Sequence, residues 1–159
     1  MIGERVFPGD PNQTMFIVKP MPDVVGHLEL EQVAAMRDEI LAKGFRLRIS
    51  TDHLLGEEDL RMMYPGVSDR LWDATVAHLS GQRVIKALLG GGADSIERLA
   101  DLVGRNVSPK SCGPGTLRYR YGCHVPVQLG EGLIYWCNAI HCPRTAEDAK
   151  REIAWFFTR

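Results

Sequence analysis

One histidine is placed where a side chain could do nucleophilic chemistry. His141 closes the apolar run Asn138-Ala139-Ile140-His141, and a proline and a helical pattern follow it. A strand end that leads into a helix commonly borders a cleft and favours anions. Neutral imidazole can carry a group covalently near pH 7. The alternative is a strand-end histidine that only bonds a backbone carbonyl.

Three charged side chains could support that histidine. Glu152 lies in the following helical segment, where it could accept a proton from one ring nitrogen of His141 and fix the tautomer. Lys19 ends the first apolar run, and Arg118 follows a loop of small residues that would let its guanidinium approach phosphate oxygens. Cations around a histidine are what phosphoryl transfer requires. Each of the three could instead be a solvated surface charge.

The cysteines gather late in the sequence, at Cys112, Cys123, Cys137 and Cys142. The tightest pairing, Cys137 and Cys142, has four residues between them, whereas structural zinc ligands are usually paired two to four residues apart. Reduced thiols are the favoured interpretation, because a free cysteine behaves as a small hydrophobic residue. A zinc-stabilised interaction module remains an alternative, because His124 adjoins one cysteine and His141 another.

Composition limits the classes of protein that these residues could serve. The chain has 159 residues, of which 45% are hydrophobic, which suits one globular domain. Nineteen Lys and Arg against twenty Asp and Glu give a formal net charge of -1, which argues against a nucleic-acid or membrane-surface partner. The sequence shows neither a membrane-spanning run nor a signal-peptide core, so a cytoplasmic location is expected.

Hydrophobic periodicity predicts the elements that must position the site. The expected strands are Met15 to Val18, Phe45 to Ser50, Val84 to Leu89 and Ile134 to Ile140. The first expected helix begins at Leu30 and stops at Gly44, and two short helices are expected within 57–80, separated near Pro65-Gly66. Another begins at a cap at Ser95 and closes at Gly104. The last is capped by Thr145 and has Ala146, Ala149, Ile153 and Phe157 on one face.

This order predicts an α+β fold of the ferredoxin-like βαββαβ type, a four-stranded antiparallel sheet with helices packed on one face. Residues 1–13 are expected to form an N-terminal tail, and residues 14–159 a single domain. Gly130-Glu131-Gly132, between two apolar flanks, predicts a hairpin.

Several motifs occur together in a recognisable order. They are Lys19-Pro20, Lys43-Gly44-Phe45, Pro114-Gly115-Thr116-Leu117-Arg118, Asn138-Ala139-Ile140-His141 and Ala149-Lys150-Arg151-Glu152-Ile153. Between about residues 14 and 157 the chain resembles the nucleoside diphosphate kinases. Each motif alone is weak, and the last three together are specific.

The resemblance implies a ping-pong transfer of the γ-phosphoryl group from ATP or another nucleoside triphosphate to a nucleoside diphosphate. Mg²⁺ would arrive with the nucleotide, no metal-binding residue is expected, and a homo-oligomer is implied. The resemblance implies that His141 is the nucleophile, that Glu152 orients it and that Tyr64 lies near it. It implies that Asn138 contacts the sugar, that Lys19 contacts the sugar and the transferred phosphate, and that Arg118 contacts the phosphates. Trp72 would stack on the base.

The chain departs from the family pattern at two positions beside the site. Ala100 stands where the family has a phosphate-binding arginine, and Pro143 stands in place of a serine. The missing charge could come from one of four other arginines, Arg98, Arg105, Arg120 or Arg144. These departures favour, as the alternative function, a catalytically weak nucleotide-binding or regulatory homologue.

Two insertions relative to the family are also expected, one near residues 20–26 and one over residues 119–137. The second contains the predicted hairpin and could cover the site or alter a subunit contact.

Overall fold

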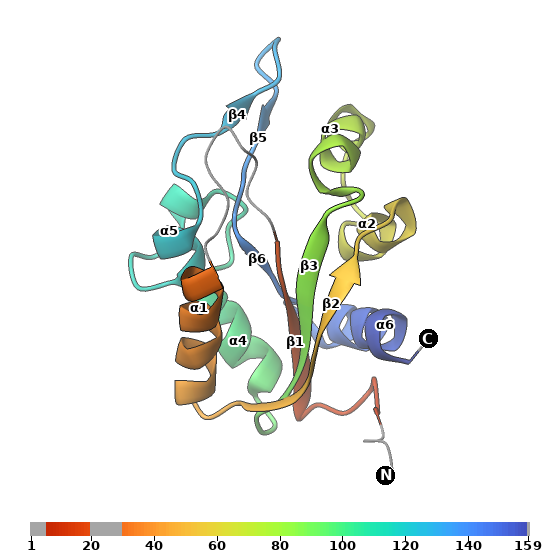
Figure 1. The fold of residues 1–159 in the computed structure, drawn as a ribbon, viewed down its shortest axis with the longest axis vertical. Coiled ribbons are helices and arrows are strands. Elements are labelled where there is room, and N and C mark those ends of the chain that lie inside the picture. Colours follow the sequence, from red (N-terminus) through yellow and green to blue (C-terminus); the bar gives the residue numbers. More distant parts are fainter. Residues whose placement is uncertain (1–5, 20–29, 159) are drawn as a thin grey trace.

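The computed structural model describes residues 6–19 and 30–158. The insertion expected near residues 20–26 lies outside the described residues, as do the first five residues of the expected tail. The central sheet has four strands in the order β2-β3-β1-β6, and every neighbouring pair is antiparallel. The predicted ferredoxin-like α+β fold is confirmed (Figure 1).

Strand β1 (Gln13–Val18) occupies the middle of this sheet. It pairs with β3 (Arg83–Gly90) on one side and with β6 (Ile140–His141) on the other. All six of its residues are buried, so the strand is covered on both faces. It begins at Gln13, two residues earlier than the apolar run suggested.

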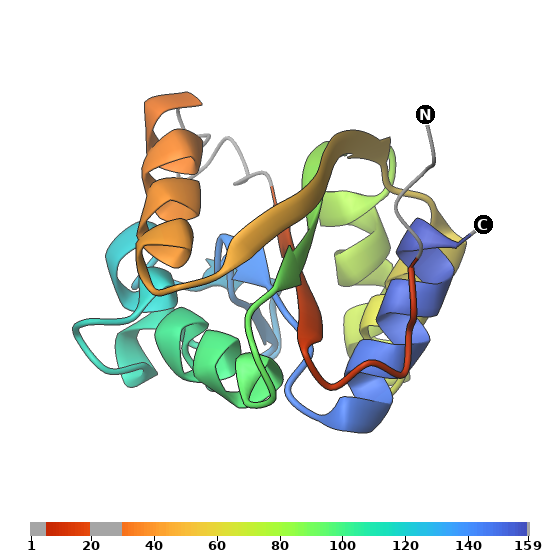
Figure 2. The same cartoon turned by 90° about the horizontal axis from the view of Figure 1, so that it is seen from below.

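The expectation that all helices pack on one face is wrong. Helices α1 (Leu30–Ala42), α4 (Ser95–Val103) and α5 (Leu117–Tyr121) cover one face of the sheet. Helices α2 (Glu57–Met63), α3 (Asp69–Leu79) and α6 (Ala146–Phe157) lie on the other side, and Figure 2 shows the sheet between the two groups.

Alternation along β1 explains the two layers. Phe16 and Val18 belong to the core shared with α1 and α4, whereas Met15 and Ile17 belong to the core shared with α2 and α6. Successive side chains of a strand point to opposite faces, so a strand that is apolar throughout needs cover on both.

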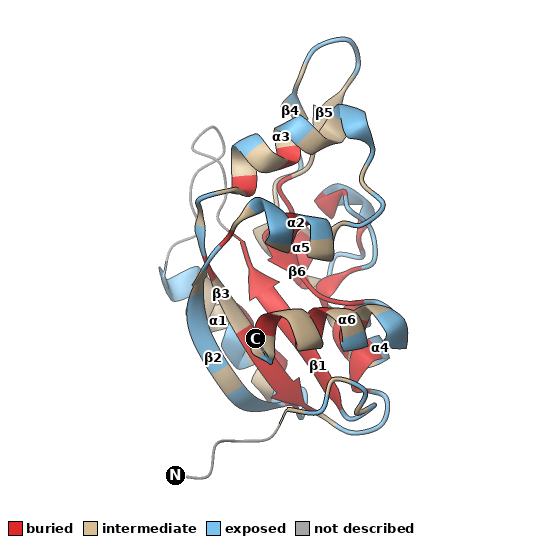
Figure 3. Ribbon diagram, turned by 90° about the vertical axis from the view of Figure 1, so that its right-hand side faces the viewer, coloured by how far each residue is buried: buried red, intermediate tan, exposed pale blue. Residues whose placement is uncertain are grey.

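Strand β2 (Arg46–Leu54) is more exposed than its alternating pattern predicted. It lies at the edge of the sheet, and most of its residues are exposed (Figure 3). Its register against β3 shifts between Leu47 and Ile49, which interrupts the strict two-residue period. Phe45, just before the strand, carries the apolar contact and is 4% exposed, whereas Leu47 is 38% exposed.

The single strand expected over residues 134–140 is divided in two. β5 (Ile134–Tyr135) pairs with β4 (Val127–Gln128) in the predicted hairpin, whose turn has positive φ at residues 130–132. Only β6 joins the main sheet. Between them Ala139 adopts φ 68°, and the Ile140 amide donates to the Asn138 carbonyl at 2.7 Å, a tight turn that ends the extended run.

The helix termini agree in part with the predicted caps. The Thr145 hydroxyl accepts a hydrogen bond from the Asp148 amide at 3.1 Å, as expected for the cap of α6. Ser95 is instead the first helical residue, because its hydroxyl donates to the Pro11 carbonyl and Asp94 precedes it as the cap. Of the predicted apolar face of α6, Ala149 and Ile153 are buried, Phe157 is half-buried and Ala146 is exposed. Phe156 is also buried.

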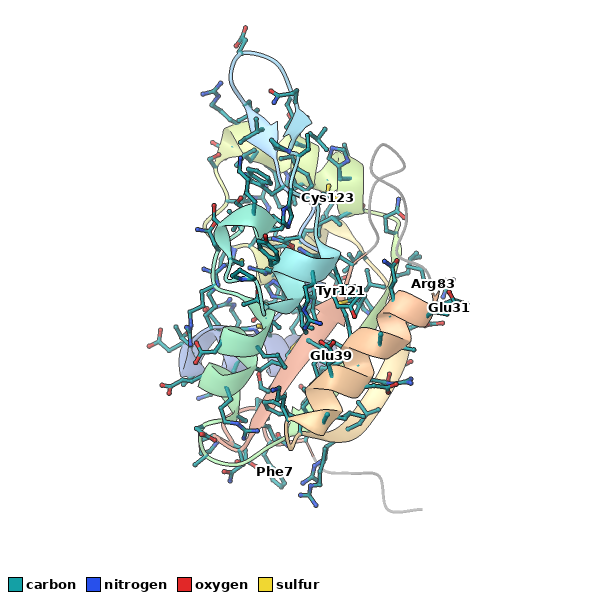
Figure 4. All side chains as sticks on the ribbon, turned by 90° about the vertical axis from the view of Figure 1, so that its left-hand side faces the viewer. Phe7, Glu31, Glu39, Arg83, Tyr121 and Cys123 are labelled. Carbon is teal, nitrogen blue, oxygen red and sulfur yellow. The ribbon has the colours of Figure 1, made fainter. Side chains whose placement is uncertain are left out.

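Two short elements were not predicted, a 3₁₀ turn at Pro109–Ser111 and the one-turn helix α5. Both are too short to show periodicity. The Arg120 guanidinium on α5 pairs with the carboxylate of Glu39 at 2.6 Å, on the side of α1 that faces Tyr121 (Figure 4). Among the helices of the described ranges, none has the length and hydropathy needed to cross a membrane.

Candidate active site

Six of the seven predicted site residues meet beside the ends of β1 and β6. His141 in β6 pairs with Ile17 in β1, and the Lys19 amide donates to the Ala139 carbonyl at 2.7 Å. The two neighbouring strands thus bring residues from opposite ends of the sequence together. The six residues are Lys19, Tyr64, Arg118, Asn138, His141 and Glu152, and all line one of two adjoining cavities.

His141 and Glu152 form the predicted pair. Nε2 of His141 is hydrogen-bonded to Oε1 of Glu152, and the two residues are 7% and 1% exposed. A carboxylate only accepts hydrogen bonds, so Nε2 carries the proton and Nδ1 keeps a free lone pair. In this arrangement Nδ1 is the ring nitrogen that is available to another group.

Lys19 is held by two polar partners at the end of β1. Its ammonium donates to the Tyr64 hydroxyl at 3.0 Å and to Oδ1 of Asn138. Burial, with a smaller contribution from the nearby Arg118 charge, holds the pKa of Lys19 well below its usual value.

Tyr64 connects this lysine to the histidine. Its ring meets the His141 imidazole edge to face, with 5.3 Å between the ring centroids. Burial raises the pKa of Tyr64, so its hydroxyl stays protonated at neutral pH and can donate a hydrogen bond.

Arg118 is buried under the site and fixes its backbone. Its Nε donates to the Ile140 carbonyl at 3.0 Å, and Nη1 donates to the carbonyls of Asn106 at 3.1 Å and Gly104 at 3.3 Å. Burial lowers the pKa of the guanidinium, which nevertheless stays charged at neutral pH. Arg118 therefore joins β6 to the loop after α4, and within residues 6–19 and 30–158 its Nη2 forms no hydrogen bond.

The two cavities differ in chemistry. The cavity that contains His141 and Glu152 has a volume of about 240 Å³ and is also lined by Arg118, Arg144 and Arg151. The adjoining cavity, of about 150 Å³, shares Tyr64, Val107 and Asn138 with the first. Its other walls are mostly apolar or aromatic, from Val67, Leu71, Ile134, Tyr135 and Trp136, and Lys19 and Thr75 are their polar members. The site thus has a cationic end and an apolar end.

Trp72 is the one predicted site residue that the structure does not bring to this groove. The Arg61 guanidinium lies over its ring, 3.5 Å from the centroid, and the indole packs against the core that contains α6. Consecutive helical residues point about 100° apart, and in α3 it is Leu71 that lines the apolar cavity.

Tyr135 and Trp136 are site residues that sequence reasoning missed. They belong to the expected insertion over residues 119–137, and β5 carries them to the wall of the apolar cavity. The Tyr135 ring also stacks on His78 of α3, with 4.7 Å between centroids and 18° between planes. Two adjacent aromatic residues after a hairpin were the available signal.

The cysteines lend no support to the zinc alternative. All four are free thiols, and the residues that the structure describes contain no group of three or more His, Cys, Asp or Glu side chains that could hold a metal ion. Burial raises the pKa of Cys137 and of Cys142 to about 11, so both remain protonated.

Of the four arginines considered as substitutes for the missing charge, three lie elsewhere and have partners. Arg98 donates to the Lys43 carbonyl at 2.6 Å, Arg105 pairs with Asp101 at 2.7 Å, and Arg120 pairs with Glu39. Only Arg144 lines the cavity of His141.

Comparison with known proteins decides the family. The family model described as nucleoside diphosphate kinase matches residues 12–159. The chain belongs to the nucleoside diphosphate kinase family. A nucleoside diphosphate kinase of Persephonella marina is 30% identical over 147 residues, which span 92% of this chain and 94% of that protein.

Solved structures of nucleoside diphosphate kinases share the fold. The enzyme of Encephalitozoon cuniculi superposes with a TM-score of 0.71 at 21% identity, covering 93% of this chain and 90% of the other. The Aquifex aeolicus enzyme gives 0.70 at 23% identity, covering 92% and 94%. The Borrelia burgdorferi enzyme, solved as a transition-state mimic with vanadate and ADP, gives 0.69 at 23% identity, covering 91% and 86%.

Proposed function

We propose that this member of the nucleoside diphosphate kinase family is an active kinase that works through a phosphohistidine on His141. The observation that carries the proposal is the buried pair of His141 and Glu152, which leaves Nδ1 unprotonated in a cavity lined by arginines. The related Borrelia burgdorferi enzyme, which holds ADP and vanadate, supports the same chemistry.

The transfer proceeds in two half-reactions. The Nδ1 lone pair attacks the γ-phosphorus of a nucleoside triphosphate, the nitrogen–phosphorus bond forms, and the bond to the β-phosphate oxygen breaks with its electrons on the leaving diphosphate. A second nucleoside diphosphate then attacks the phosphohistidine, and the imidazole leaves as a neutral base. Glu152 stabilises the positive charge that the ring carries in between.

Lys19 and Arg118 supply charge and position. Both are buried beside the site, and an entering phosphate favours the charged form of the Lys19 amine, because attraction between opposite charges is stronger in a water-poor site than in solvent. Asn138 holds the Lys19 ammonium and also donates to the Val107 carbonyl, so it fixes the junction between the two cavities. We assign Asn138 and Lys19 to the sugar and the nearest phosphate.

The nucleoside occupies the apolar cavity in this proposal. Tyr135 and Trp136 offer aromatic surface there, and stacking on such rings accepts every base. These residues take the role that the sequence had suggested for Trp72. We therefore expect the protein to accept nucleotides with any of the common bases.

Mg²⁺ enters as part of the nucleotide substrate, bound to its phosphates. The described residues form no acidic cage for a resident ion, and no step is assigned to one. We also propose self-association, because β2 presents an unpaired edge within the described sheet.

Labelling with ATP that carries a radioactive γ-phosphate tests the proposal. The wild-type protein should acquire an acid-labile, alkali-stable phosphate and pass it to any added nucleoside diphosphate. His141→Asn should take up none. His124→Asn is the matched control, because His124 is exposed. Its side chain forms one hydrogen bond within the described residues, to the Tyr119 carbonyl. A wild-type protein that stays unlabelled with MgATP, or a His141→Asn protein that is labelled, would refute the mechanism.

A further inference from the structure

Three guanidinium groups line the cavity of His141, and two of them are already engaged. Arg118 gives Nε and Nη1 to backbone carbonyls. Arg151 gives Nη1 to the Asp148 carboxylate at 2.8 Å. Arg144 forms no hydrogen bond or ion pair with any residue in the described part of the chain.

The carboxylates of the same cavity are also paired. Asp148 accepts from Arg151, and Glu152 accepts from His141. Both carboxylates thus have partners other than Arg144, and among the described residues Arg144 is the guanidinium of this cavity that no side chain or carbonyl engages. An anion that enters the cavity could bind the five N–H donors of this guanidinium without breaking an existing ion pair or hydrogen bond within the described residues.

The backbone of Arg144 is fixed although its side chain is exposed. His141 is held in the sheet by β1, Pro143 is buried, and Thr145 caps α6 on the other side. The charge of Arg144 is close enough to lower the pKa of Arg118 and to act on the Cys142 thiol. The guanidinium is thus tethered beside the nucleophile on a short, well-ordered connection.

Helix α4 has no cation at the position of Ala100. Ala100 lies in the core formed by α1 and α4 with no exposed surface, so α4 presents only a methyl group at this position. Lys19 and Arg118 are buried and carry several structural hydrogen bonds, which leaves few donors for the other phosphates of a nucleotide.

We propose that Arg144 is a phosphate-binding residue of this cleft, and that it holds the phosphates that are not transferred. The inference rests on the proposed function in so far as the ligand is a nucleotide. Arg144 binds the leaving diphosphate in the first half-reaction and the incoming diphosphate in the second, so it contributes to both. The guanidinium suits this role because it can contact two phosphate oxygens at once.

Binding of ADP and of adenosine, measured by titration calorimetry at equal ionic strength, tests this residue without requiring turnover. Arg144→Ala should weaken ADP binding by about tenfold or more, because a charge-assisted hydrogen bond is lost. Adenosine has no phosphate, so its affinity should not change. Arg144→Lys should recover part of the ADP affinity, and the dependence of ADP binding on salt should be weaker in Arg144→Ala.

Arg37→Ala is the matched control, since Arg37 is an exposed arginine on α1 that pairs with its neighbour Asp38. Equal ADP affinity in wild type and Arg144→Ala would overturn the inference, as would an equal loss of ADP and adenosine binding, which indicates a structural effect. ADP binding that depends on Arg144 in a protein without phosphohistidine supports this site and refutes the proposed transfer. Phosphohistidine formation together with unchanged ADP binding in Arg144→Ala supports the proposed transfer and refutes the role of Arg144.

Discussion

Glu152 lies on the buried face of α6, where an ionised carboxylate is costly unless it is hydrogen-bonded. Its partner is a ring nitrogen of His141, so burial and function require the same contact. In the proposed transfer the carboxylate has two effects, because it fixes the tautomer of the imidazole and stabilises the positive charge that would develop on the ring.

Glu152→Gln separates those effects, since the side-chain oxygen of glutamine can still accept a hydrogen bond from the Nε2–H group but carries no charge. Losing a charged hydrogen bond of about 1.5–3 kcal/mol should slow phosphoenzyme formation by roughly ten- to a hundredfold. Single-turnover labelling with ATP measures this rate. Glu147→Gln, in the exposed first turn of the same helix, should leave it unchanged. An unchanged rate in Glu152→Gln would show that orientation alone is sufficient.

At the level of elements, the expected insertion is a wall of the site rather than a remote extension. Its hairpin is attached to α3 through the stack of Tyr135 on His78, and the next residue, Trp136, lines the apolar cavity. An aromatic stack of this kind contributes about 0.5–1.5 kcal/mol. This stack is one of the contacts that position the wall, and the Lys110 ammonium over the Trp136 ring, 5.5 Å from the centroid, is another.

His78→Ala removes that stack, whereas His78→Phe keeps an aromatic ring at the same place. The alanine variant should raise KM for nucleoside diphosphates by up to roughly tenfold and leave kcat nearly unchanged, because His78 does not line the cavity of His141. Steady-state kinetics of both variants provide the measurement. A similar KM for the alanine and phenylalanine variants would mean that stacking does not position the hairpin.

The elements also show how far sequence reasoning reaches. β1, α1 and the hairpin follow from apolar runs, helical periodicity and a glycine-rich turn, and all were predicted. The division of residues 134–140 was not, because the positive φ of Ala139 leaves no mark in the side-chain pattern. Local periodicity likewise cannot tell which of two adjacent α3 residues, Leu71 or Trp72, faces a cavity made by a distant segment.

For the site, motif order located the histidine, its carboxylate and the buried cations, and the structure brings them together. It did not identify Tyr135 and Trp136, since their role depends on where an insertion folds. It left Arg144 as one candidate of four, because the Lys43 carbonyl that engages Arg98 and the Glu39 carboxylate that engages Arg120 come from distant parts of the chain. The division into a tail over residues 1–13 and one domain over 14–159 stays a prediction.

For the molecule as a whole, burial of Lys19 makes folding stability depend on pH. The pKa of Lys19 is lower in the folded protein than its usual value of 10.5, so the unfolded chain binds more protons between these two values. Stability contributed through Lys19 should therefore increase as the pH rises through this window. The same burial disfavours the charged lysine at neutral pH.

Lys19→Met tests this linkage, because it keeps an unbranched side chain of similar length without the charge. The free energy of unfolding, measured by denaturant titration, should exceed that of the wild type near neutral pH, and the difference should shrink as the pH approaches 10.5. Comparing the two proteins at each pH separates the change made at Lys19, which includes the effect of its charge on the Cys137 thiol, from the opposite trend of the buried cysteines, whose pKa is about 11. A difference that does not vary with pH would contradict the assignment.

The pairing of β1 with β6 has a consequence for how the protein acquires activity during folding. Lys19 and Asn138 are 119 residues apart in the sequence, and their contact closes a loop that contains most of the sheet. Contacts of such high sequence separation form slowly, because the chain loses loop entropy before it gains their stabilisation. A partly folded chain that holds only β1, β2 and β3 would have the lysine without the nucleophile. Recovery of phosphoryl transfer should therefore lag behind recovery of helix content during refolding and report the last docking step.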